Sequence, residues 1–431
     1  MKIKTQDIKL AIVGLGYVGL PLACLFTRKY KVIGFDINTE RVKELQAGYD
    51  STGSFTEMEM QQTLNNGLYV TSDEKLLDEC NIFIISVPTP VTSDHKVDLR
   101  NLLGATETVG RHLHKNDIVI FESTVYPGAT EEECVPLLER TSGLSYNLDF
   151  FVGYSPERVN VGDHEHTIEK IKKITSGSTP EIADFVDELY NSVLENGTHK
   201  APTIRVAEAA KIVENCQRDV NIAFMNEMNH IFNAMGINTR DVLEAAGTKW
   251  NFIHLEPGLV GGHCIGVDPY YLIEKANTVN EKASLLSTAR RLNDSMGEYI
   301  ADQTIKRMAD AGLNPEKSHV LVLGFTFKEN CNDIRNTKVI DIVLQLRKTI
   351  DELTICDPYA IPDMVKNEYG VDIESDTEKV ATEQYDAILL CVKHKEFTSL
   401  PVCKMLKPNG ILCDIKGFYR EKREETYYKE I

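Results

Sequence analysis

The feature that most constrains the fold is a glycine-rich turn near the N-terminus, placed at the end of a short apolar run. The run Leu10 to Val13 leads into Gly14-Leu15-Gly16-Tyr17-Val18-Gly19, a helical pattern follows, and Asp36 closes the next apolar run. Glycines at these spacings let the backbone approach a pyrophosphate closely, and the N-terminus of the helix attracts its charge. An acidic side chain about 20 residues on accepts hydrogen bonds from ribose hydroxyls. The pattern predicts a dinucleotide site that prefers NAD to NADP; the alternative is a tight strand-to-helix turn without a ligand.

Around this turn, the first third of the chain alternates short apolar runs with helical patterns. Runs bounded by Gly, Pro or Asp are typical of parallel strands that are covered on both faces. The expected strands are Leu10 to Val13, Lys31 to Phe35, Ile82 to Val87, Ile118 to Phe121 and Phe150 to Val152. The sequence therefore predicts a doubly wound α/β sheet here.

A long segment without Gly or Pro follows, from about Ala207 to Met235, and Gly236 is placed to end it as a helix. Apolar residues occupy much of its circumference, so we expect a helix that is buried between domains or subunits. A second helical region is predicted from about Lys282 to Ala311.

The strand and helix pattern then restarts in the last third. The expected strands are His319 to Leu323, Leu353 to Cys356, Ala387 to Val392 and Ile411 to Asp414. Asp357 follows the second of them, as Asp36 does in the first half, but the first turn reads Gly324-Phe325-Thr326-Phe327-Lys328, with bulky residues in place of glycines. We infer a nucleotide-binding relative that does not hold NAD in the usual way.

Charge and composition exclude several classes of function. The formal net charge is -18, which argues against a general binder of nucleic acids or anionic membranes. No run approaches the 18 or more apolar residues of a membrane span. The ten cysteines contain no C-x-x-C pair, which disfavours a structural zinc module, and several lie in apolar runs, as reduced thiols of a cytoplasmic protein do. His164 and His166 form an H-x-H without further ligands, so we interpret them as exposed loop and expect no metal.

Cys264 stands apart from the other cysteines, in the loop Gly261-Gly262-His263-Cys264-Ile265-Gly266-Val267-Asp268-Pro269. Flanking glycines would let a ligand approach the backbone, and Asp268 lies four residues on, which favours a reactive thiol. A buried structural cysteine is the alternative, and local composition does not choose between them. We interpret His263 as a structural or surface histidine rather than a catalytic base.

Polar residues at three other places suit an anionic, oxygen-rich ligand. Lys211, Asn215 and Arg218 fall on one stripe of the long helix, which is either a buried polar stripe or a solvated face. Glu122-Ser123-Thr124 and Tyr154-Ser155-Pro156-Glu157-Arg158 end two expected strands, and ligands of open α/β sheets bind at the carboxyl ends of strands. Thr124 could hold a water or hydroxyl and Glu157 could act as a general base; capping and turn formation are the alternatives.

Six segments, taken in order, resemble the UDP-glucose/GDP-mannose dehydrogenase family over nearly the whole chain. They are Gly14 to Ala23, Glu122 to Gly128, Ser155 to Arg158, Glu208 to Asn215, Gly261 to Pro269 and Gly324 to Thr337. Gly258 to Tyr271 and Thr326 to Thr337 look like the branch that acts on UDP-N-acetylhexosamines, which includes the Vi-antigen and O-antigen dehydrogenases.

The resemblance implies a four-electron oxidation at C6 of the sugar, with two NAD+ used in succession and a uronic acid as product. Cys264 would hold the intermediate aldehyde as a thiohemiacetal and, after a second hydride transfer, as a thioester that water hydrolyses. Lys211, Asn215 and Asp268 would surround the reacting oxygen, with Lys211 stabilising negative charge and Asp268 ordering a water. Thr124 and Glu157 would position or activate water, Glu157 in thioester hydrolysis.

The resemblance also implies which residues bind the two ligands. The NAD site would comprise Gly14, Gly16, Tyr17, Val18, Gly19, Asp36, Arg41, Thr89 and Thr124, with Arg335 from the C-terminal domain. The UDP-sugar would contact Arg158, Val159, Lys211, Asn215, Arg218, Gly261, Phe327 and Lys328.

The expected fold class is therefore α/β, with two doubly wound Rossmann-like domains joined by a central helical domain that contains one long helix. The expected bounds are 1–202 for the NAD-binding domain, 203–312 for the central helical dimerisation domain with the catalytic cysteine loop, and 313–431 for the UDP-sugar-binding domain. The long helix would form the core of a homodimer.

One segment departs from the family pattern. Gly247-Thr248-Lys249-Trp250-Asn251-Phe252 replaces the arginine-bearing segment with which UDP-glucose enzymes contact substrate across the dimer. The leading hypothesis is accordingly UDP-N-acetylglucosamine 6-dehydrogenase, with the C4 epimer UDP-N-acetylgalactosamine as the near alternative, and UDP-N-acetylmannosamine and UDP-glucose after it. Two hypotheses come from other classes of protein. A non-catalytic nucleotide-sugar sensor would not need the set Lys211, Asn215, Cys264 and Asp268. A two-electron dehydrogenase of the hydroxyacid type would not need Cys264.

Overall fold

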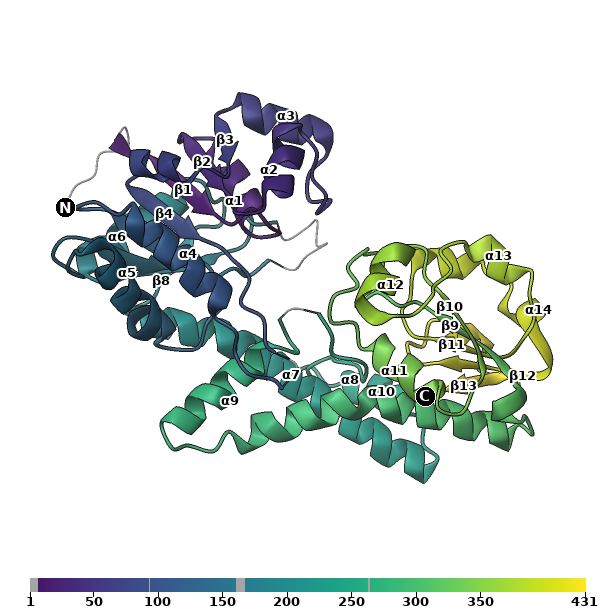
Figure 1. Ribbon diagram of the computed structural model, residues 1–431. Coiled ribbons are helices and arrows are strands. Elements are labelled where there is room, and N and C mark those ends of the chain that lie inside the picture. Colours follow the sequence, from purple (N-terminus) through teal and green to yellow (C-terminus); the bar gives the residue numbers. More distant parts are fainter. Residues whose placement is uncertain (1–6, 93, 160–166, 263) are drawn as a thin grey trace. The chain divides into compact units, whose positions relative to one another are not determined.

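The computed structural model describes residues 7–92, 94–159, 167–262 and 264–431 (Figure 1). The chain divides into two compact units, which are described separately: the first comprises residues 1–215 and 270–282, and the second comprises 216–269 and 283–431. Two helices have residues in both units, α7 (Ile204–Met235) and α9 (Asp268–Thr278).

The first unit is built on an eight-stranded sheet in the order β3-β2-β1-β4-β5-β6-β7-β8. Neighbouring strands run parallel except β6 and β7, which are antiparallel. The strands are β1 (Leu10–Val13), β2 (Val32–Phe35), β3 (Leu68–Thr71), β4 (Ile82–Ile85), β5 (Ile118–Phe121), β6 (Phe151–Tyr154), β7 (Lys173–Gly177) and β8 (Thr198–Lys200).

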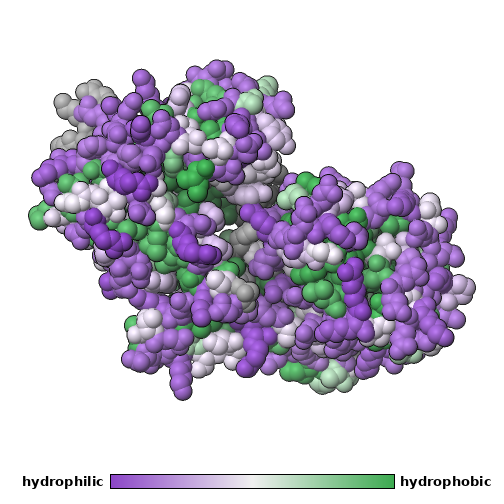
Figure 2. Space-filling view, viewed as in Figure 1, coloured by the Kyte–Doolittle hydropathy of each residue, from purple (hydrophilic) through white to green (hydrophobic). Residues whose placement is uncertain are grey.

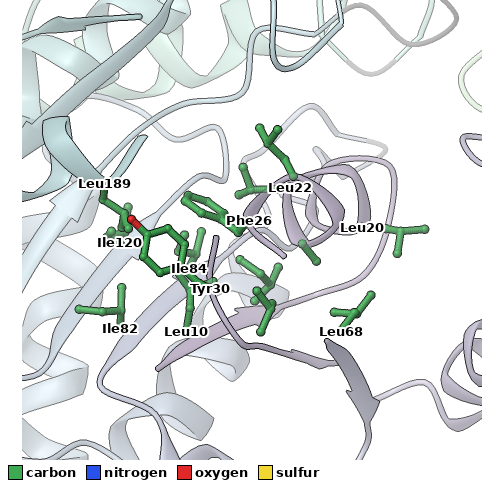
Figure 3. Close-up of a cluster of buried hydrophobic side chains, with 14 of the residues drawn as sticks. Leu10, Leu20, Leu22, Phe26, Tyr30, Leu68, Ile82, Ile84, Ile120 and Leu189 are labelled. Carbon is green, nitrogen blue, oxygen red and sulfur yellow. The ribbon is translucent and has the colours of Figure 1, made fainter. Parts of the chain in front are cut away.

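Both faces of this sheet are buried, because successive apolar residues of each strand point to opposite sides. Leu10 and Ile84 face the cluster drawn in Figure 3, where they meet Phe26 of α1 and Leu189 of α6. Intervening residues such as Phe83 face α4 and α5 on the other side. The helices of this unit are α1 (Gly19–Phe26), α2 (Thr39–Gln46), α3 (Glu57–Asn65), α4 (Arg100–Arg111), α5 (Val135–Ser142) and α6 (Pro180–Asn191).

The second unit is built on a parallel five-stranded sheet in the order β10-β9-β11-β12-β13. Its strands are β9 (His319–Leu323), β10 (Glu352–Cys356), β11 (Tyr385–Leu390), β12 (Leu406–Asp414) and β13 (Tyr428–Glu430). One face packs on α10 and α11 and the other on residues of α13 and α14. The helices are α8 (Thr239–Gly247), α10 (Ser284–Asp310), α11 (Val339–Leu346), α12 (Pro362–Tyr369), α13 (Thr377–Ala381) and α14 (Val402–Met405).

The expected fold class is confirmed: two α/β sheets with a helical region between them in the sequence. Each predicted strand is present, with ends that differ from the expected ones by at most five residues. The long helix runs from Ile204 to Met235, with Gly236 at a φ of +70° just after it. The predicted strands do not include β3, β7, β8 and β13. Of these, β7 reads Lys-Ile-Thr-Ser-Gly, whose polar residues hide a strand that is in fact buried.

The visible face of the molecule is dominated by hydrophilic residues, with smaller hydrophobic areas among them (Figure 2). Among the described residues, no helix combines the length and the apolar character that crossing a bilayer needs.

Candidate functional site

The glycine turn between β1 and α1 leaves room for a ligand at one glycine and closes tightly at the other two. Gly14 has a φ of +93°, which L side chains rarely adopt, and a Cβ on Gly19 would lie 1.8 Å from the carbonyl oxygen of Gly14. A Cβ on Gly16 would meet no described atom within 4 Å. Gly14 and Gly19 therefore serve the turn, whereas Gly16 leaves the backbone open to a phosphate, as a bound dinucleotide needs.

Tyr17 and Val18 complete the turn and are half-buried. Val18 is the N-cap of α1 and supplies no side-chain hydrogen bond to the first turn. The amide groups at this helix end are consequently suited to an anion, which the positive end of the helix also attracts. The residues of the turn fit NAD.

Asp36 follows β2 and lies half-buried beside the turn. Its Oδ2 accepts from the backbone N–H of Leu15 at 2.8 Å, and its Oδ1 accepts from that of Asn38 at 2.9 Å. Each carboxylate oxygen can accept two hydrogen bonds, so one position on each remains for the ribose hydroxyls.

Arg41 on α2, which we expected to line the NAD site, is buried and supports the turn. Its Nε donates to the carbonyl oxygen of Leu15 at 3.1 Å, and its Nη2 donates to Oδ1 of Asp50 at 2.7 Å. The Leu15 backbone thus accepts a hydrogen bond from Arg41 at its carbonyl oxygen and donates one to Asp36 from its N–H. These two hydrogen bonds fix the glycine turn.

Thr89 and Thr124 connect the carboxyl ends of two neighbouring strands, β4 and β5. The hydroxyl of Thr89 donates to the carbonyl oxygen of Thr124 at 2.7 Å, and the Tyr271 hydroxyl donates to the carbonyl oxygen of Thr89. Ser123 adds a hydrogen bond of 2.6 Å to the carbonyl oxygen of Val87. Both threonines are half-buried at the sheet edge where ligands of parallel sheets bind.

Glu157, Arg158 and Val159 form the loop after β6. Oε1 of Glu157 accepts from the backbone N–H groups of Arg158 and Val159, both at 2.6 Å, and its Oε2 lies 3.8 Å from Nζ of Lys173. Arg158 pairs with Glu214 of α7 at 2.7 Å. Glu157 is therefore held by backbone donors and a buried ammonium beside the end of the sheet.

The polar stripe of α7 runs from a buried lysine to an exposed arginine. Lys211 is 7% exposed, Asn215 is half-buried and Arg218 is exposed. A buried ammonium has little contact with water, so it needs a ligand or a neighbouring polar group as its partner. At Lys211, the structure therefore favours the interpretation as a buried polar stripe over that as a solvated face.

The Cys264 loop is docked in the second unit on the loop that contains Phe327. Gly262 donates to the carbonyl oxygen of Asn336 at 3.1 Å and accepts from the Asn336 side chain at 2.7 Å. Glycine is required at both loop positions, since a Cβ on Gly261 would lie 2.6 Å from the oxygen of Asn336 and one on Gly262 would lie 2.9 Å from the Phe327 ring.

Cys264 and Asp268 lie at the N-terminal end of α9. The carbonyl oxygen of Cys264 accepts from the N–H groups of Val267 and Asp268 at 3.1 and 2.8 Å. Cys264 is exposed and Asp268 is 2% exposed. The exposure of Cys264 supports the reactive-thiol interpretation over the structural one, because a reactive thiol must be accessible to its substrate.

Most of the other cysteines are chemically protected. Burial raises the pKa of Cys24, Cys80, Cys134, Cys216, Cys356 and Cys413 to about 12. Burial also raises the pKa of Cys391. These thiols stay protonated at neutral pH and are poor nucleophiles.

A small hollow of about 30 Å³ lies beside the docked Cys264 loop, within the second unit. Gly261, Phe327 and Lys328 line it, as the predicted UDP-sugar contacts, together with Lys338 and Lys416. Burial lowers the pKa of Lys416. Glu329 also lines the hollow, and Lys338 pairs with Asp294 and Asp341 at 3.3 Å. Lys328 and Lys416 are therefore the lysines of the lining that suit an anionic ligand.

Lys416 was missed by the sequence analysis, although a signal for it existed: it follows the carboxyl end of the predicted strand Ile411 to Asp414 by two residues. Arg335, the expected C-terminal contact to NAD, forms a bidentate pair with Asp333 at 2.8 and 2.6 Å. His164, His166 and His263 lie outside the described residues. The described residues contain no group of three or more His, Cys, Asp or Glu side chains that could hold a metal ion.

The fold and the glycine turn define an NAD-binding α/β oxidoreductase. Three sequence models of the UDP-glucose/GDP-mannose dehydrogenase family match the chain: the NAD binding domain at residues 8–194, the central domain at 205–295 and the UDP binding domain at 321–421. The chain belongs to the UDP-glucose/GDP-mannose dehydrogenase family. The predictions of family, NAD cofactor and oxidoreductase class are confirmed.

Individual relatives lie within the same family. The UDP-N-acetyl-D-glucosamine 6-dehydrogenase of Pseudomonas aeruginosa is 50% identical over 97% of this chain and 99% of its own. The enzyme of the same name from Salmonella typhi is 50% identical, covering 97% and 95%. Among solved structures, a UDP-D-ManNAc dehydrogenase from Pyrococcus horikoshii superposes with a TM-score of 0.88 at 31% identity, over 98% and 99% of the two chains.

Proposed function

We propose that the protein oxidises C6 of UDP-N-acetylglucosamine to the corresponding uronic acid. The observation that carries the proposal is the docking of Gly261 and Gly262 on the loop of Phe327 and Asn336, beside the hollow that Gly261 and Lys328 line, with the exposed Cys264 two residues further along the chain. A nucleophile is thereby placed next to a site for an anionic ligand, which a two-electron alcohol dehydrogenase has no use for. The relatives that are 50% identical over 97% of this chain support the choice of sugar.

Cys264 carries the covalent chemistry in this proposal. Bound NAD supplies the acceptor for one hydride in each of two successive oxidations. The Cys264 thiolate adds to the C6 aldehyde left by the first oxidation, and the oxygen takes up a proton to give a thiohemiacetal. The second oxidation removes the C6 hydrogen as a hydride and the hydroxyl hydrogen as a proton, which leaves a thioester. Water then attacks the thioester carbon, the carbon–sulfur bond breaks, and the carboxylate and the thiol are released.

The remaining residues have the roles that the family resemblance assigns. The Lys211 ammonium stabilises negative charge on the C6 oxygen, with Asn215 and Asp268 around it. Thr124 positions water and Glu157 accepts its proton during thioester hydrolysis. Arg158, Val159, Arg218, Gly261, Phe327 and Lys328 contact the UDP-sugar, and Lys416 joins them because it lines the same hollow.

The NAD site in this proposal is the one that the family resemblance implies. It comprises the glycine turn together with Tyr17, Val18, Asp36, Arg41, Thr89, Thr124 and Arg335. Arg41 acts through the Leu15 carbonyl oxygen, to which its Nε donates. Three domains, at 1–202, 203–312 and 313–431, divide this work between NAD, the dimer and the UDP-sugar.

We further propose a homodimer in the cytoplasm. Val206, Val213, Phe224 and Ile231 are 44–56% exposed and recur on α7 at intervals of 7, 11 and 7 residues, which return to the same side of a helix. An exposed apolar stripe of this length supports burial against a second copy. The use of NAD and the many buried thiols support the reducing compartment.

The proposal is tested by counting NADH formed per sugar consumed, with a panel of UDP-N-acetylglucosamine, UDP-N-acetylgalactosamine, UDP-N-acetylmannosamine and UDP-glucose. Two NADH per sugar and the highest kcat/KM for UDP-N-acetylglucosamine are expected; one NADH per sugar overturns the thioester route. Cys264→Ser should abolish uronate formation while NAD still binds. Cys403→Ser is the matched control, since Cys403 is also exposed, and it should retain full activity.

A further inference from the structure

A closed ionic cluster lies behind Glu157 in the first unit, and the residue roles above leave it unused. Its centre is Lys173 of β7, a lysine that is only 1% exposed. Nζ of Lys173 donates to Oε2 of Glu122 at 2.7 Å and to the carbonyl oxygen of Pro156 at 3.1 Å, and it lies 3.8 Å from Oε2 of Glu157. One buried ammonium therefore stands between two carboxylates.

Glu122 is the more deeply buried of the two carboxylates. It is 1% exposed, directly after β5, and the Tyr190 hydroxyl of α6 donates to its second oxygen. Oε2 of Glu157, by contrast, receives no hydrogen bond from the residues that the structure describes. The ion pair of Lys173 with Glu122, at 2.7 Å, is therefore closer than its ion pair with Glu157, at 3.8 Å.

Two carboxylates and one ammonium carry a net negative charge, which a buried site disfavours. Burial raises the pKa of Glu122 to about 7, and the Lys173 ammonium opposes that rise. The neighbouring charge of Glu157 raises it further. Glu122 and Glu157 therefore share one ammonium, which lies 2.7 Å from the former and 3.8 Å from the latter.

The other charged groups near Glu157 do not replace Lys173 as its counter-ion. Arg158 belongs to the same loop, but its guanidinium pairs with Glu214 of α7 at 2.7 Å and donates to the carbonyl oxygen of Lys172 at 2.6 Å. Tyr190 on α6 has a raised pKa because of burial and the charge of Glu122, so it remains a neutral donor. Lys173 is consequently the cation to which Glu157 responds.

We propose that Lys173 and Glu122 are positioning residues that set the proton affinity of Glu157, the base of thioester hydrolysis. This inference rests on the proposed function, because it assigns Glu157 to that step. Lys173 keeps Glu157 ionised and able to accept the proton of water, and Glu122 competes for the same ammonium. The protonation state of Glu122 therefore tunes the step without contact between Glu122 and the substrate.

The cluster predicts pH shifts of opposite sign for two changes. Glu122→Gln keeps the shape of the side chain but removes its charge, so the acidic limb of kcat against pH should move down by about one pH unit. Lys173→Met is made in the Glu122→Gln background, because removing Lys173 alone would leave two buried carboxylates without a cation. The double variant should move the limb up by about one pH unit or more from its position in Glu122→Gln.

Rapid mixing with UDP-N-acetylglucosamine and NAD+ isolates the hydrolytic step. At the acidic end of the profile, the double variant should still release two NADH per active site in a burst and then turn over at least about tenfold more slowly than wild type. The KM values for both substrates should stay within about twofold. Lys173→Arg retains the charge and should restore a profile close to that of wild type.

Tyr190→Phe provides an independent readout if a charged-cluster variant fails to fold. Removing its hydrogen bond destabilises ionised Glu122, so the limb should move in the same direction as in Glu122→Gln, by a smaller amount.

Glu157→Gln separates failure of this inference from failure of the residue role beneath it. If Glu157→Gln turns over at the wild-type rate, the role of Glu157 in the proposed function is wrong. If Glu157→Gln keeps the burst and loses turnover, the role of Glu157 in the proposed function stands. If Glu122→Gln and the double variant then leave the acidic limb of the kcat profile in place, or move it in the same direction as each other, the inference about Lys173 and Glu122 is overturned.

Discussion

Nε2 of His394 donates a hydrogen bond to Oδ2 of Asp357 over 2.8 Å, and both side chains are fully shielded from solvent. Nδ1 of His394 accepts from the N–H of Asn330 at 2.9 Å, which fixes the proton on Nε2. Hydrogen bonds from His394 and from backbone N–H groups hold the pKa of Asp357 below its usual value, although burial opposes them.

This pair explains why Asp357 is not available for the ribose contact that is predicted for Asp36 in the first sheet. Oδ2 of Asp357 also accepts from the N–H groups of Phe325 and Thr326, and Oδ1 accepts from those of Tyr359 and Ala360. Neither oxygen has capacity left for a ribose. The acidic residue after the second strand thus serves loop structure in the second sheet, whereas each oxygen of Asp36 accepts only one of these hydrogen bonds and keeps a position for the predicted ribose contact.

A matched pair of substitutions should separate these two roles. Asp36→Ala should raise the KM for NAD about 10- to 100-fold, because one charge-assisted hydrogen bond to ribose is worth about 1.5–3 kcal/mol. Asp357→Ala should instead lower the midpoint of thermal unfolding and leave the KM for NAD within about twofold. The measurements are steady-state kinetics and a thermal melt; a large NAD effect of Asp357→Ala would contradict the division.

The three glycines of the turn should also separate binding from folding. Gly16→Ala should leave thermal stability unchanged, because its Cβ meets no described atom within 4 Å, and should raise the dissociation constant of NAD at least about tenfold. Gly19→Ala should destabilise the protein by about 1–3 kcal/mol, since the new Cβ would lie 1.8 Å from the oxygen of Gly14. Normal NAD binding by Gly16→Ala would show that the phosphate does not approach there.

The sequence was sufficient for the parts of the molecule that are governed by local rules. Apolar runs that end at Gly or Asp fixed strands such as Leu10–Val13 and His319–Leu323 to the residue, and the glycine spacing fixed the turn before α1. Cys264 was separable from the other cysteines by its glycine neighbours, and its exposure agrees with that.

The parts that could not be predicted depend on contacts between distant segments. Lys173 stands in a polar stretch, and its burial follows from Glu122, 51 residues away, and from the antiparallel pairing of β6 with β7. Likewise, the Asn336 side chain donates a hydrogen bond to the carbonyl oxygen of Gly262, which lies 74 residues earlier. Nothing in either segment alone indicates that pairing. The order of family motifs suggested one site, but only the fold shows which side chains meet within each unit.

Glu208 should make stability depend on pH. Its carboxylate is completely buried on α7, accepts from the N–H of Thr130 at 3.0 Å, and burial raises its pKa from 4.5 to about 7. Because the folded pKa lies above the unfolded one, the unfolded state releases its proton first as pH rises. Glu208 therefore lowers the free energy of unfolding between about pH 4.5 and 7, by about 3 kcal/mol in total, and adds no further change above that window.

Glu208→Gln removes this titration. The midpoint of thermal unfolding, measured at intervals from pH 4.5 to 7.5, should fall less steeply with pH in Glu208→Gln than in the parent protein. Glu57→Gln is the control, because Glu57 is exposed in the first turn of α3, and its pH profile should match the parent. Parallel profiles for the parent and Glu208→Gln would show that Glu208 is ionised in the folded protein over the whole range.

The apolar stripe of α7 should decide the oligomeric state. Phe224 is 53% exposed and Ile231 is 44% exposed, so a charge at either place costs little in an isolated chain and much in a buried interface. The double variant Phe224→Asp with Ile231→Asp should raise the dimer dissociation constant at least about 100-fold, seen by light scattering across a dilution series. Met58→Asp is the control, because Met58 is 78% exposed on α3, away from α7 in sequence, and it should leave the mass unchanged. A double variant that keeps the parent mass at every dilution would exclude this face of α7 as the dimer core.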